Sequence, residues 1–318
     1  MTRFVLGTRG SALALAQAEL TRIALSRVFP ELEIEQKVFV TRGDQKLDLS
    51  LIRANEAGGK GLFTKELEDA LLTGTIDVAV HSLKDLPGQN PPGLTVTAVL
   101  ERAPTADVLI TKTAMAFDAL PQGAVIGTSS VRRARQLQWL RPDLRVREWR
   151  GNVQTRLRKL FEDPDVTGIV LAHAGLARLG WLGEALEASG LSLQTEVGTF
   201  HAQSLGARLF PAIGQGAIAL QSRADRAEVT AVLARIDHSP THLAIRAERE
   251  LQRLLAGDCA LPVGVRTELT GDQLRMQAVL FSPDESAPPS EAAAEGTDPE
   301  VVAAQVFDEL TNPMVSRT

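Results

Sequence analysis

Charged and hydroxyl side chains gather where apolar runs of this sequence end. One such run, residues 76–81, leads directly into Ser82, Lys84 and Asp85. A carboxylate among cationic groups stays ionised, so Asp85 could stabilise a developing positive charge or pass a proton. The structural alternative is an aspartate that pairs with Lys84 at the end of a strand. Lys84 could equally form a Schiff base, and its neighbours do not decide between these roles.

Arginine and hydroxyl side chains also occur at a series of predicted strand-to-helix junctions. An arginine fork binds a carboxylate or phosphate through two hydrogen bonds, and helix N-termini attract anions. A single arginine of this kind is usually solvated or paired at the surface, but the series predicts a site for a ligand with several carboxylates. The residues are Arg9, Ser11, Thr128, Ser129, Ser130, Arg132, Arg133, Arg150, Arg156 and Arg178.

The sequence contains one cysteine, Cys259, in a glycine-flanked loop that follows a helical segment. It cannot form an internal disulfide. A lone thiol in a turn is either a small apolar residue or a nucleophile that carries a group covalently, and its spacing alone favours the first interpretation. A single cysteine also agrees with a reducing cytoplasm.

Two other kinds of site are excluded by spacing. The run from Gly58 to Gly61 lacks the hydroxyl residue that follows the lysine of a phosphate-binding P-loop, which excludes a nucleoside triphosphatase. We expect instead a mobile glycine-rich lid that includes Lys60 and Phe63. The histidines show no convincing set of ligands, and no metal site is predicted.

The composition describes an ordinary soluble protein. A length of 318 residues predicts two or three domains, and 44% hydrophobic and 23% charged residues are globular values. Of the 34 basic residues 27 are arginine, yet the net charge is −5. Such a chain suits a small anionic ligand better than a nucleic acid. Neither a secretory signal nor a membrane span is visible, so we expect a cytoplasmic protein.

Short β-branched runs alternate with helical patterns, which is typical of α/β units. We expect two such units, with the chain crossing near residue 103 and returning over 210–220. Open α/β sheets bind ligands at strand ends, so the ligand is expected in the cleft between the units. Ser11 is expected to cap the first helix, and Thr128 or Ser129 the helix at 131–140. The other expected helices cover 63–72 and 153–161, and the strands 4–6, 34–40, 76–81, 107–111, 124–127, 145–149 and 168–172.

A third, smaller α+β domain follows and carries Cys259. Its expected elements are a helix over 241–255, strands over 263–269 and 274–281, and a closing helix over 301–310. Residues 282–300, rich in Ser, Pro, Ala and Glu, are expected to form a flexible loop. The predicted domains are therefore 1–102 with 210–224, 103–209, and 225–318.

Taken in order, these segments resemble the porphobilinogen deaminase family, also called hydroxymethylbilane synthase, along nearly the whole chain. The matching segments are Thr8-Arg9 with Ser11, Val40-Thr41-Arg42-Gly43-Asp44, residues 58–68, 77–87, 127–133, Arg150-Gly151-Asn152-Val153, 171–180, Gly214-Gln215-Gly216-Ala217 and the Cys259 loop.

The resemblance implies a transferase of porphyrin and heme biosynthesis. Such an enzyme joins four porphobilinogen molecules head to tail, releases ammonia at each step, and frees the linear tetrapyrrole hydroxymethylbilane by hydrolysis. The implied fold is two α/β domains like type II periplasmic binding proteins, plus a small C-terminal α+β domain. A monomer is expected, with no nucleic acid or membrane partner.

The resemblance also implies roles for individual residues. A dipyrromethane cofactor is bound through a thioether to Cys259. Asp85 contacts pyrrole nitrogens and stabilises the azafulvene-like cation. The implied cofactor-binding residues are Ser82, Lys84, Thr128, Ser129, Ser130, Arg132, Arg133, Arg150 and Gln215, and the implied substrate-binding residues are Arg9, Ser11, Arg150, Arg156 and Arg178.

Several positions depart from the family's pattern. Ala12 replaces a proline, and Asp258 replaces a glycine beside Cys259, where its charge would raise the pKa of the thiol. Residues 102–108 lack the usual acidic run, which weakens any role for acids there. Residues 181–209 form a longer region than the family leads us to expect. The 282–300 segment replaces a strand, so a reduced sheet is expected.

Two other functions were weighed. A solute-binding protein with the same two-domain cleft would bind a small polycarboxylate without catalysis. The missing export signal and the cysteine loop argue against it. A DNA-binding regulator is disfavoured by the net charge of −5.

Overall fold

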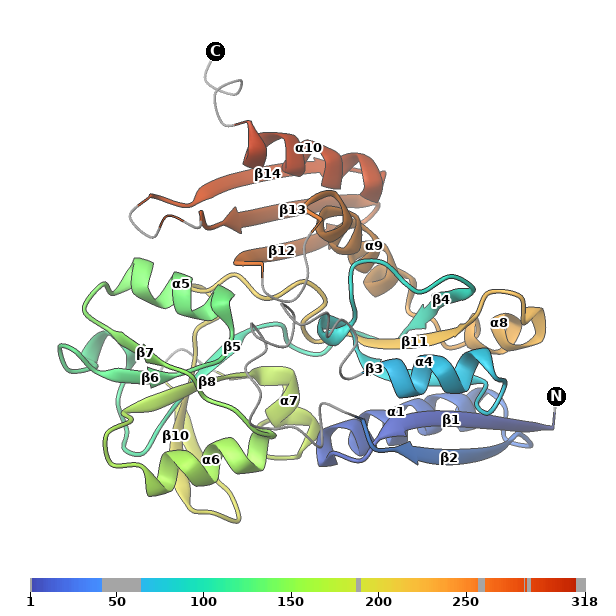
Figure 1. Cartoon of the computed structure of the whole chain (residues 1–318), viewed down its shortest axis with the longest axis horizontal. Helices are drawn as coiled ribbons and strands as arrows, with labels where there is room; N and C mark the ends of the chain where they lie inside the picture. Colours follow the sequence, from blue (N-terminus) through green and yellow to red (C-terminus); the bar gives the residue numbers. More distant parts are fainter. Residues whose placement is uncertain are drawn as a thin grey trace. The chain divides into compact units, whose positions relative to one another are not determined.

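The computed structural model describes residues 2–41, 64–186, 190–256, 261–282, 284 and 287–312. The chain forms two compact units (Figure 1). Unit 1 comprises Met1–Arg102 and Ala217–Cys259, and unit 2 comprises Ala103–Gly216 and Ala260–Thr318. The division into three domains stays a prediction. Within the described ranges, no helix is both long and apolar enough to cross a membrane.

Unit 1 is built on a five-stranded sheet in the order β2-β1-β3-β11-β4. β1 (Arg3–Arg9) pairs in parallel with β2 (Glu33–Phe39) and β3 (Val78–Ser82). β11 (Ile218–Arg223) lies antiparallel to both β3 and β4 (Leu94–Val99). The returning chain therefore completes the first sheet.

Helices pack on both faces of this sheet. Phe4 and Leu6 of β1 share a core cluster with Leu25, whereas Val5 shares another with Leu67. Since neighbouring strand residues face opposite sides, the alternation places α1 and α4 on opposite faces. Ser11 caps α1 as predicted, because its side chain accepts a hydrogen bond from the Ala14 N–H. Among the described residues of unit 1, the helical elements are α1 (Ala12–Val28), α4 (Lys65–Leu72), the 3-10 turn η1 (Leu83–Asp85), α8 (Ala227–Leu233) and α9 (Ser239–Leu254).

Unit 2 contains a six-stranded sheet in the order β7-β6-β8-β5-β10-β9. β6 (Val125–Gly127) is parallel to β7 (Arg145–Arg147) and β8 (Gly168–Ala172). β5 (Asp107–Thr111) is antiparallel to β8 and to β10 (Thr199–Ser204). β9 and β10 form a hairpin inside the longer region at 181–209, where no strands were predicted; β9 is Leu191–Gln194.

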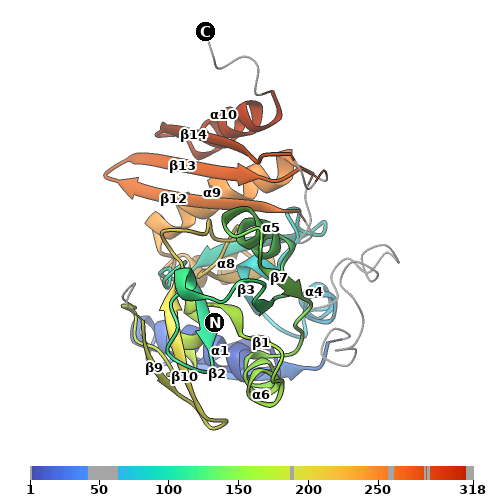
Figure 2. The same ribbon diagram turned by 90° about the vertical axis from the view of Figure 1, so that its left-hand side faces the viewer.

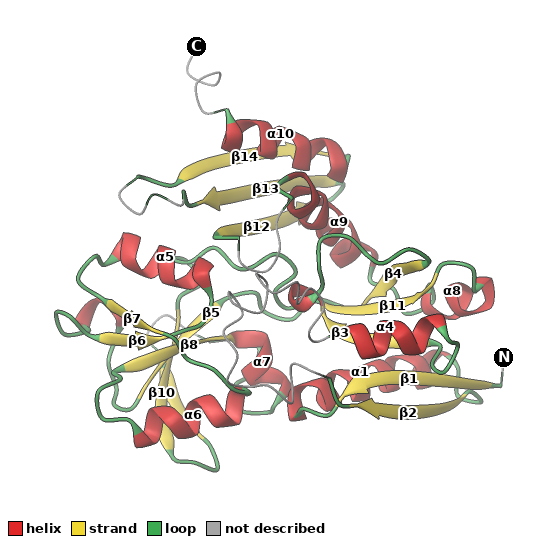
Figure 3. Cartoon of the chain, viewed as in Figure 1, coloured by secondary structure: helices red, strands yellow, loops and turns green. Residues whose placement is uncertain are grey.

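The two sheets share one topology, seen in the alternation of helices and strands in Figure 3. Across each sheet, three parallel strands lie next to one antiparallel strand, which is β11 in unit 1 and β5 in unit 2. Along the chain, each of these two strands is the first after the chain crosses from the other unit. The predicted α/β fold class with two α/β sheets is therefore confirmed, and the likeness to type II periplasmic binding proteins stays a prediction.

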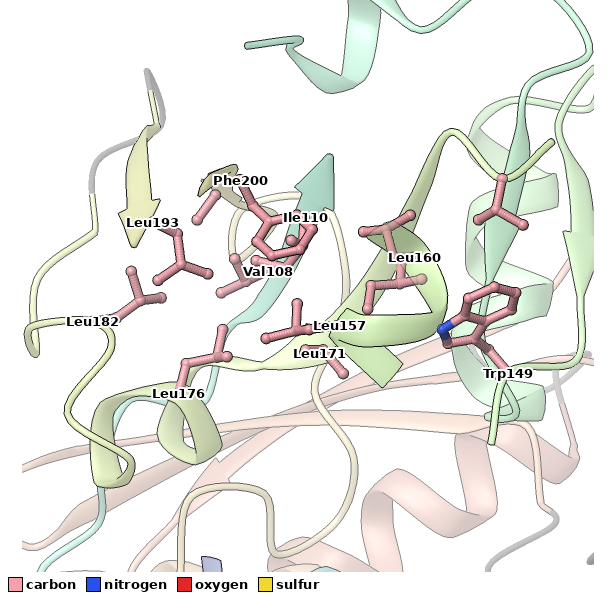
Figure 4. Packing of buried hydrophobic residues seen from close by; sticks show 13 residues of the cluster. Val108, Ile110, Trp149, Leu157, Leu160, Leu171, Leu176, Leu182, Leu193 and Phe200 are labelled. Carbon is pink, nitrogen blue, oxygen red and sulfur yellow. The ribbon is translucent and has the colours of Figure 1, made fainter. Parts of the chain in front are cut away.

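The core of unit 2 lies between its sheet and helices (Figure 4). Val108 and Ile110 of β5 pack with Leu157 and Leu160 of α6 and with Phe200 of β10. α5 has the predicted bounds, but its cap is Ser130 rather than Thr128 or Ser129, since Ser130 accepts the Arg133 N–H. The helical elements are η2 (Phe117–Ala119), α5 (Val131–Leu140), α6 (Val153–Glu162) and α7 (His173–Arg178).

The C-terminal part of unit 2 forms a three-stranded antiparallel sheet with one helix, α10 (Pro299–Thr311) (Figure 2). The expectation of a flexible loop over 282–300 and of a reduced sheet is wrong. β14 pairs with β13 from Leu274 opposite Gly296 to Leu280 opposite Ser290. A full ladder of pairs and the cover of α10 outweigh the weak strand propensity of alanine and glutamate. The strands are β12 (Val263–Thr270), β13 (Gln273–Leu280) and β14 (Ser290–Gly296).

Neighbouring alanines in β14 provide a test of this strand. Ala292 is buried and Ala293 is exposed. Ala292→Lys should lower the free energy of unfolding by about 2–4 kcal/mol, because it buries an unpaired charge. Ala293→Lys should change it by less than about 0.5 kcal/mol. Urea denaturation of both variants measures the difference, and equal effects would contradict the register of β14.

Candidate active site

In unit 1, two parallel strands end at the same edge of the sheet. Arg9 is the last residue of β1, and Ser82 the last of its neighbour β3. The carboxyl ends of parallel strands lie at one edge, which is where open α/β sheets bind ligands. The predicted grouping of Arg9 with Ser82, Lys84 and Asp85 at one sheet edge is therefore present within this unit.

Asp85 lies exposed between two anchored leucines. Leu83 and Leu86 are each 1% exposed and share a core cluster, whereas the side chain of Asp85 is exposed and Lys84 is half-buried. The Leu86 N–H closes the turn by donating to the Leu83 carbonyl. The alternation of buried and exposed residues in this tight turn leaves the carboxylate open to solvent.

Ser82 has a partner that the sequence analysis missed. Its hydroxyl accepts a hydrogen bond from Gln17 Nε2 at 2.8 Å and donates one to Gln17 Oε1 at 3.1 Å. Gln17 is 2% exposed on α1. A glutamine on the apolar face of a predicted helix is the signal that could have revealed this contact, because buried amides need hydrogen-bonding partners.

His81 is buried behind the turn and carries no charge at neutral pH. Burial lowers the pKa of His81 to about 4, with a smaller contribution from the positive charge of Arg9. Its Nε2 lies 3.2 Å from Gln221 Oε1. The charged groups at this strand end are therefore those of the following residues, Lys84 and Asp85.

In unit 2, the predicted hydroxyl residues follow β6, next to the parallel strands β7 and β8. Ser130 caps α5, and Thr128 accepts the Ser130 N–H through its hydroxyl at 3.2 Å. Ser129 Oγ donates to the Trp149 carbonyl at 2.8 Å and accepts the Trp149 N–H at 3.0 Å. The hydroxyl groups of residues 128–130 thus stabilise the turn after β6. They lie at the carboxyl edge of the sheet, where we expect a ligand.

Arg132 and Arg133 are buried and joined to one carboxylate. Arg132 Nη2 donates to Asp107 Oδ2 at 2.9 Å, and Arg133 Nη2 donates to Asp107 Oδ1 at 2.8 Å. Their Nη1 groups donate to main-chain carbonyls, at Phe210 and at Val170 respectively. The structure thus brings both arginines together around Asp107, and their Nη groups bind protein oxygens.

Asp107 is fully buried, and Gln215 Nε2 also donates to its Oδ1, at 2.8 Å. Burial alone would raise the pKa of this carboxyl. The charges of Arg132 and Arg133, with hydrogen bonds from Arg133 and Gln215, outweigh burial and hold the pKa below its ordinary value. The missing acidic run at 102–108 led us to expect no important role for an acidic residue there. For Asp107 that expectation is wrong, because its carboxylate binds both arginines. The available signal was an aspartate opening an otherwise apolar strand.

The remaining arginines differ in their surroundings. Arg150 donates to Glu148 Oε1 at 2.7 Å, and Arg156 Nε donates to the Gly151 carbonyl at 2.8 Å. Arg178 Nη2 donates to the Gly216 carbonyl at 2.6 Å, and burial lowers the pKa of Arg178 to about 10. None of the carboxylates in the described part of the chain pairs with Arg178.

A desolvated guanidinium of this kind fits an anionic ligand group, because burying a cation without an anion is unfavourable. The carboxylates of a dipyrromethane cofactor are groups of the required charge. The residues present therefore fit such a cofactor.

Three predicted residues, Lys60, Phe63 and Cys259, lie outside the described residues, as does Asp258. Among the residues that are described, no group of three His, Cys, Asp or Glu side chains could hold a metal ion.

Comparison with sequence families decides the assignment. The model "Porphobilinogen deaminase, dipyromethane cofactor binding domain" matches residues 4–231, and the model of the family's C-terminal domain matches residues 242–312. The chain belongs to the porphobilinogen deaminase family. This family polymerises porphobilinogen with a dipyrromethane cofactor in tetrapyrrole biosynthesis, so the expected transferase class and cofactor are confirmed.

Curated porphobilinogen deaminases resemble the chain over most of its length. That of Syntrophomonas wolfei is 44% identical over 89% of this chain and 87% of its own. That of Desulforudis audaxviator is 45% identical over 88% and 84%, and that of Roseiflexus sp. is 42% identical over 96% and 95%.

Solved structures give weaker matches. The periplasmic aliphatic sulphonate binding protein SsuA of Escherichia coli covers 80% of this chain and 75% of its own at 13% identity. Its TM-score of 0.39 is too low to establish a common fold.

Asp107→Asn should be strongly destabilising. It leaves two buried arginines without a counter-charge, and breaking a buried ion pair costs about 3–5 kcal/mol. Asp118→Asn is the matched control, because Asp118 pairs with Arg208 at the surface. It should cost less than about 1 kcal/mol.

The same substitution has a signature in pH. The folded pKa of Asp107 is below the ordinary value of 3.8. Its stabilising contribution is therefore complete above the unfolded pKa and is lost as the pH falls below about 4. Wild-type protein should lose more stability than Asp107→Asn between pH 5 and acid pH, measured by urea denaturation. If the free energy of unfolding fell equally with pH in both proteins, the charge of Asp107 would make no net contribution to stability.

Proposed function

We propose that this chain joins four porphobilinogen molecules head to tail, releasing ammonia at each addition, and then frees hydroxymethylbilane by hydrolysis. The observation that carries the proposal is the exposed carboxylate of Asp85 at the carboxyl end of the buried strand β3. This turn lies inside the stretch that matches the family's cofactor-binding domain.

Asp85 is proposed as the catalytic residue. Its carboxylate accepts a hydrogen bond from the pyrrole N–H of porphobilinogen and stabilises the positive charge that develops as the aminomethyl carbon–nitrogen bond breaks. The aminomethyl nitrogen is protonated before the bond breaks, so ammonia leaves with the electron pair of that bond and the positive charge passes to the pyrrole. The methylene carbon then bonds to the free α-carbon of the terminal pyrrole, which loses its proton. Coulomb attraction between carboxylate and cation strengthens when the ligand excludes water.

The acetate and propionate groups of the substrate are proposed to bind Arg9, Ser11, Arg150, Arg156 and Arg178. The desolvation of Arg178 supports this, because a carboxylate would compensate its buried charge. Bidentate pairing also suits a ligand that gains two carboxylates with every addition.

The cofactor is proposed to attach to Cys259 through a thioether. Dipyrromethane supplies the two linked pyrroles from which the chain grows. Its proposed contacts are Ser82, Lys84, Arg150, Gln215 and the hydroxyls of 128–130. Arg132 and Arg133 are proposed to serve the cofactor mainly by fixing this hydroxyl turn, since their Nη groups bind Asp107 and main-chain carbonyls. Direct contact of either arginine with the cofactor stays a prediction.

The remaining features of the proposal concern the protein as a whole. We propose three domains, with a lid that includes Lys60 and Phe63, and a cytoplasmic monomer without nucleic acid partners. The net charge of −5 supports the absence of nucleic acid partners, and the single cysteine supports the cytoplasmic location.

Asp85→Asn tests the catalytic assignment. Asp85 is exposed, so the variant should fold with an unchanged melting temperature, while turnover falls by about 100-fold or more. Asp225→Asn, at another exposed aspartate of unit 1, is the control and should keep full turnover. Porphobilinogen consumption and ammonia release are measured together. Near-normal turnover in Asp85→Asn would contradict the assigned role, and wild-type protein that binds porphobilinogen without consuming it would indicate a solute-binding protein.

A further inference from the structure

One face of α9 lies against the turn that carries Asp85. Ile245, Arg249 and Gln252 are spaced by four and three residues, so their side chains share one side of the helix. Ile245 belongs to the same core cluster as Leu83 and Leu86, the two leucines that flank the catalytic turn. Packing of Ile245 with Leu83 and Leu86 therefore fixes the residues on both sides of Lys84 and Asp85.

The chain continues along the same helix face after Leu86. A Cβ atom placed on Gly88 would lie only 3.1 Å from Gln252 Cγ and 3.3 Å from Gln252 Cδ. Such distances are closer than ordinary van der Waals contact. The main chain at Gly88 thus touches α9 directly, one helical turn beyond Arg249.

Arg249 binds the same segment through hydrogen bonds. Its Nη1 donates to the Pro87 carbonyl at 3.2 Å, and its Nη2 donates to the Gly88 carbonyl and to Asn90 Oδ1, each at 3.3 Å. The planar guanidinium spans two consecutive carbonyls, which a lysine could not do. Burial lowers the pKa of Arg249. Its hydrogen-bond partners within the described part of the chain are neutral oxygens.

The neighbouring residue holds α9 by a separate contact. Glu248 is fully buried and accepts two hydrogen bonds from Arg102, at 2.6 and 3.0 Å. α9 is therefore anchored without Arg249. Loss of the Arg249 side chain should release the 87–90 segment and leave the helix in place.

We infer that Arg249 is a positioning residue for Asp85: it holds the 83–90 segment against α9 and so fixes where the carboxylate stands. The inference rests on the proposed function only for the role of Asp85. The three hydrogen bonds of Arg249 tie α9 to residues 87–90, which a solvated surface cation or an arginine in an ion pair would not do. A displacement of about 1 Å in a reacting group can reduce a rate by about 100-fold, so a tether of this kind matters for turnover.

Arg249→Met and Arg249→Lys test the inference, with Arg253→Met as the matched control on the same helix. Arg253 is about half exposed and pairs with Glu250. Arg249→Met should lower kcat by about 10- to 100-fold while KM for porphobilinogen changes by less than about 3-fold. Arg249→Lys should recover part of kcat, since one of the carbonyls stays within reach. Arg253→Met should match wild type.

Hydrogen–deuterium exchange separates positioning from general stability. In Arg249→Met, uptake should rise in a peptide covering 83–90 and stay unchanged in one covering 239–248. The inference is overturned if kcat stays within about 2-fold of wild type, or if uptake rises equally in both peptides. Should Arg249→Met fail to fold, Asn90→Ala removes one of the three acceptors and should show the same pattern to a smaller degree; unchanged uptake at 83–90 would also overturn the inference.

The proposed function is tested separately by Asp85→Asn. If Asp85→Asn stays active, the catalytic assignment fails, whereas the exchange result for Arg249→Met still decides whether the segment is tethered.

Discussion

A buried carboxylate shared by two arginines organises the second unit of this protein. Asp107 opens the first strand after the chain crosses into that unit, and it accepts hydrogen bonds from Arg132, Arg133 and Gln215. These partners come from the first turn of α5 and from the segment by which the chain leaves the unit again. Removing one partner of a buried ion pair leaves an uncompensated charge at a high cost, so these side chains hold one another in place. The start of β5, the start of α5 and the returning segment are thereby joined around one side chain.

This arrangement sorts the arginines by role. Arg132 and Arg133 stand beside the hydroxyl turn at 128–130, and both pair with the one carboxylate of Asp107. Arg178 is half-buried and donates to the Gly216 carbonyl, and none of the carboxylates in the described ranges pairs with it, so a ligand could compensate its charge. Asp85 differs from these arginines because its side chain is exposed, while Leu83 and Leu86 beside it are buried. Rigid neighbours around an accessible charge are what electrostatic catalysis requires, because a preorganised group needs no rearrangement as charge develops.

Local patterns in the sequence predicted much of the fold. The bounds of β5, β8 and α5 follow from apolar runs and helical spacing. The family resemblance supplied the residues that we propose for catalysis and cofactor binding. What local patterns could not supply were contacts between distant segments. Asp107 and Gln17 act through partners far along the chain, and their types alone point to the surface. β14 was missed because its alanines and glutamates have weak strand propensity, and only pairing with β13 and cover by α10 make it a strand.

We propose that the protein builds a tetrapyrrole on pyrroles held covalently by Cys259. Intact-mass spectrometry of the purified protein provides the test. The wild-type protein should carry a mass excess equal to two linked pyrrole units, and Cys259→Ser should carry none. Brief exposure of the wild-type protein to porphobilinogen should then add species heavier by one, two and three further pyrrole units. An unmodified wild-type mass in a preparation that turns over porphobilinogen would contradict the account.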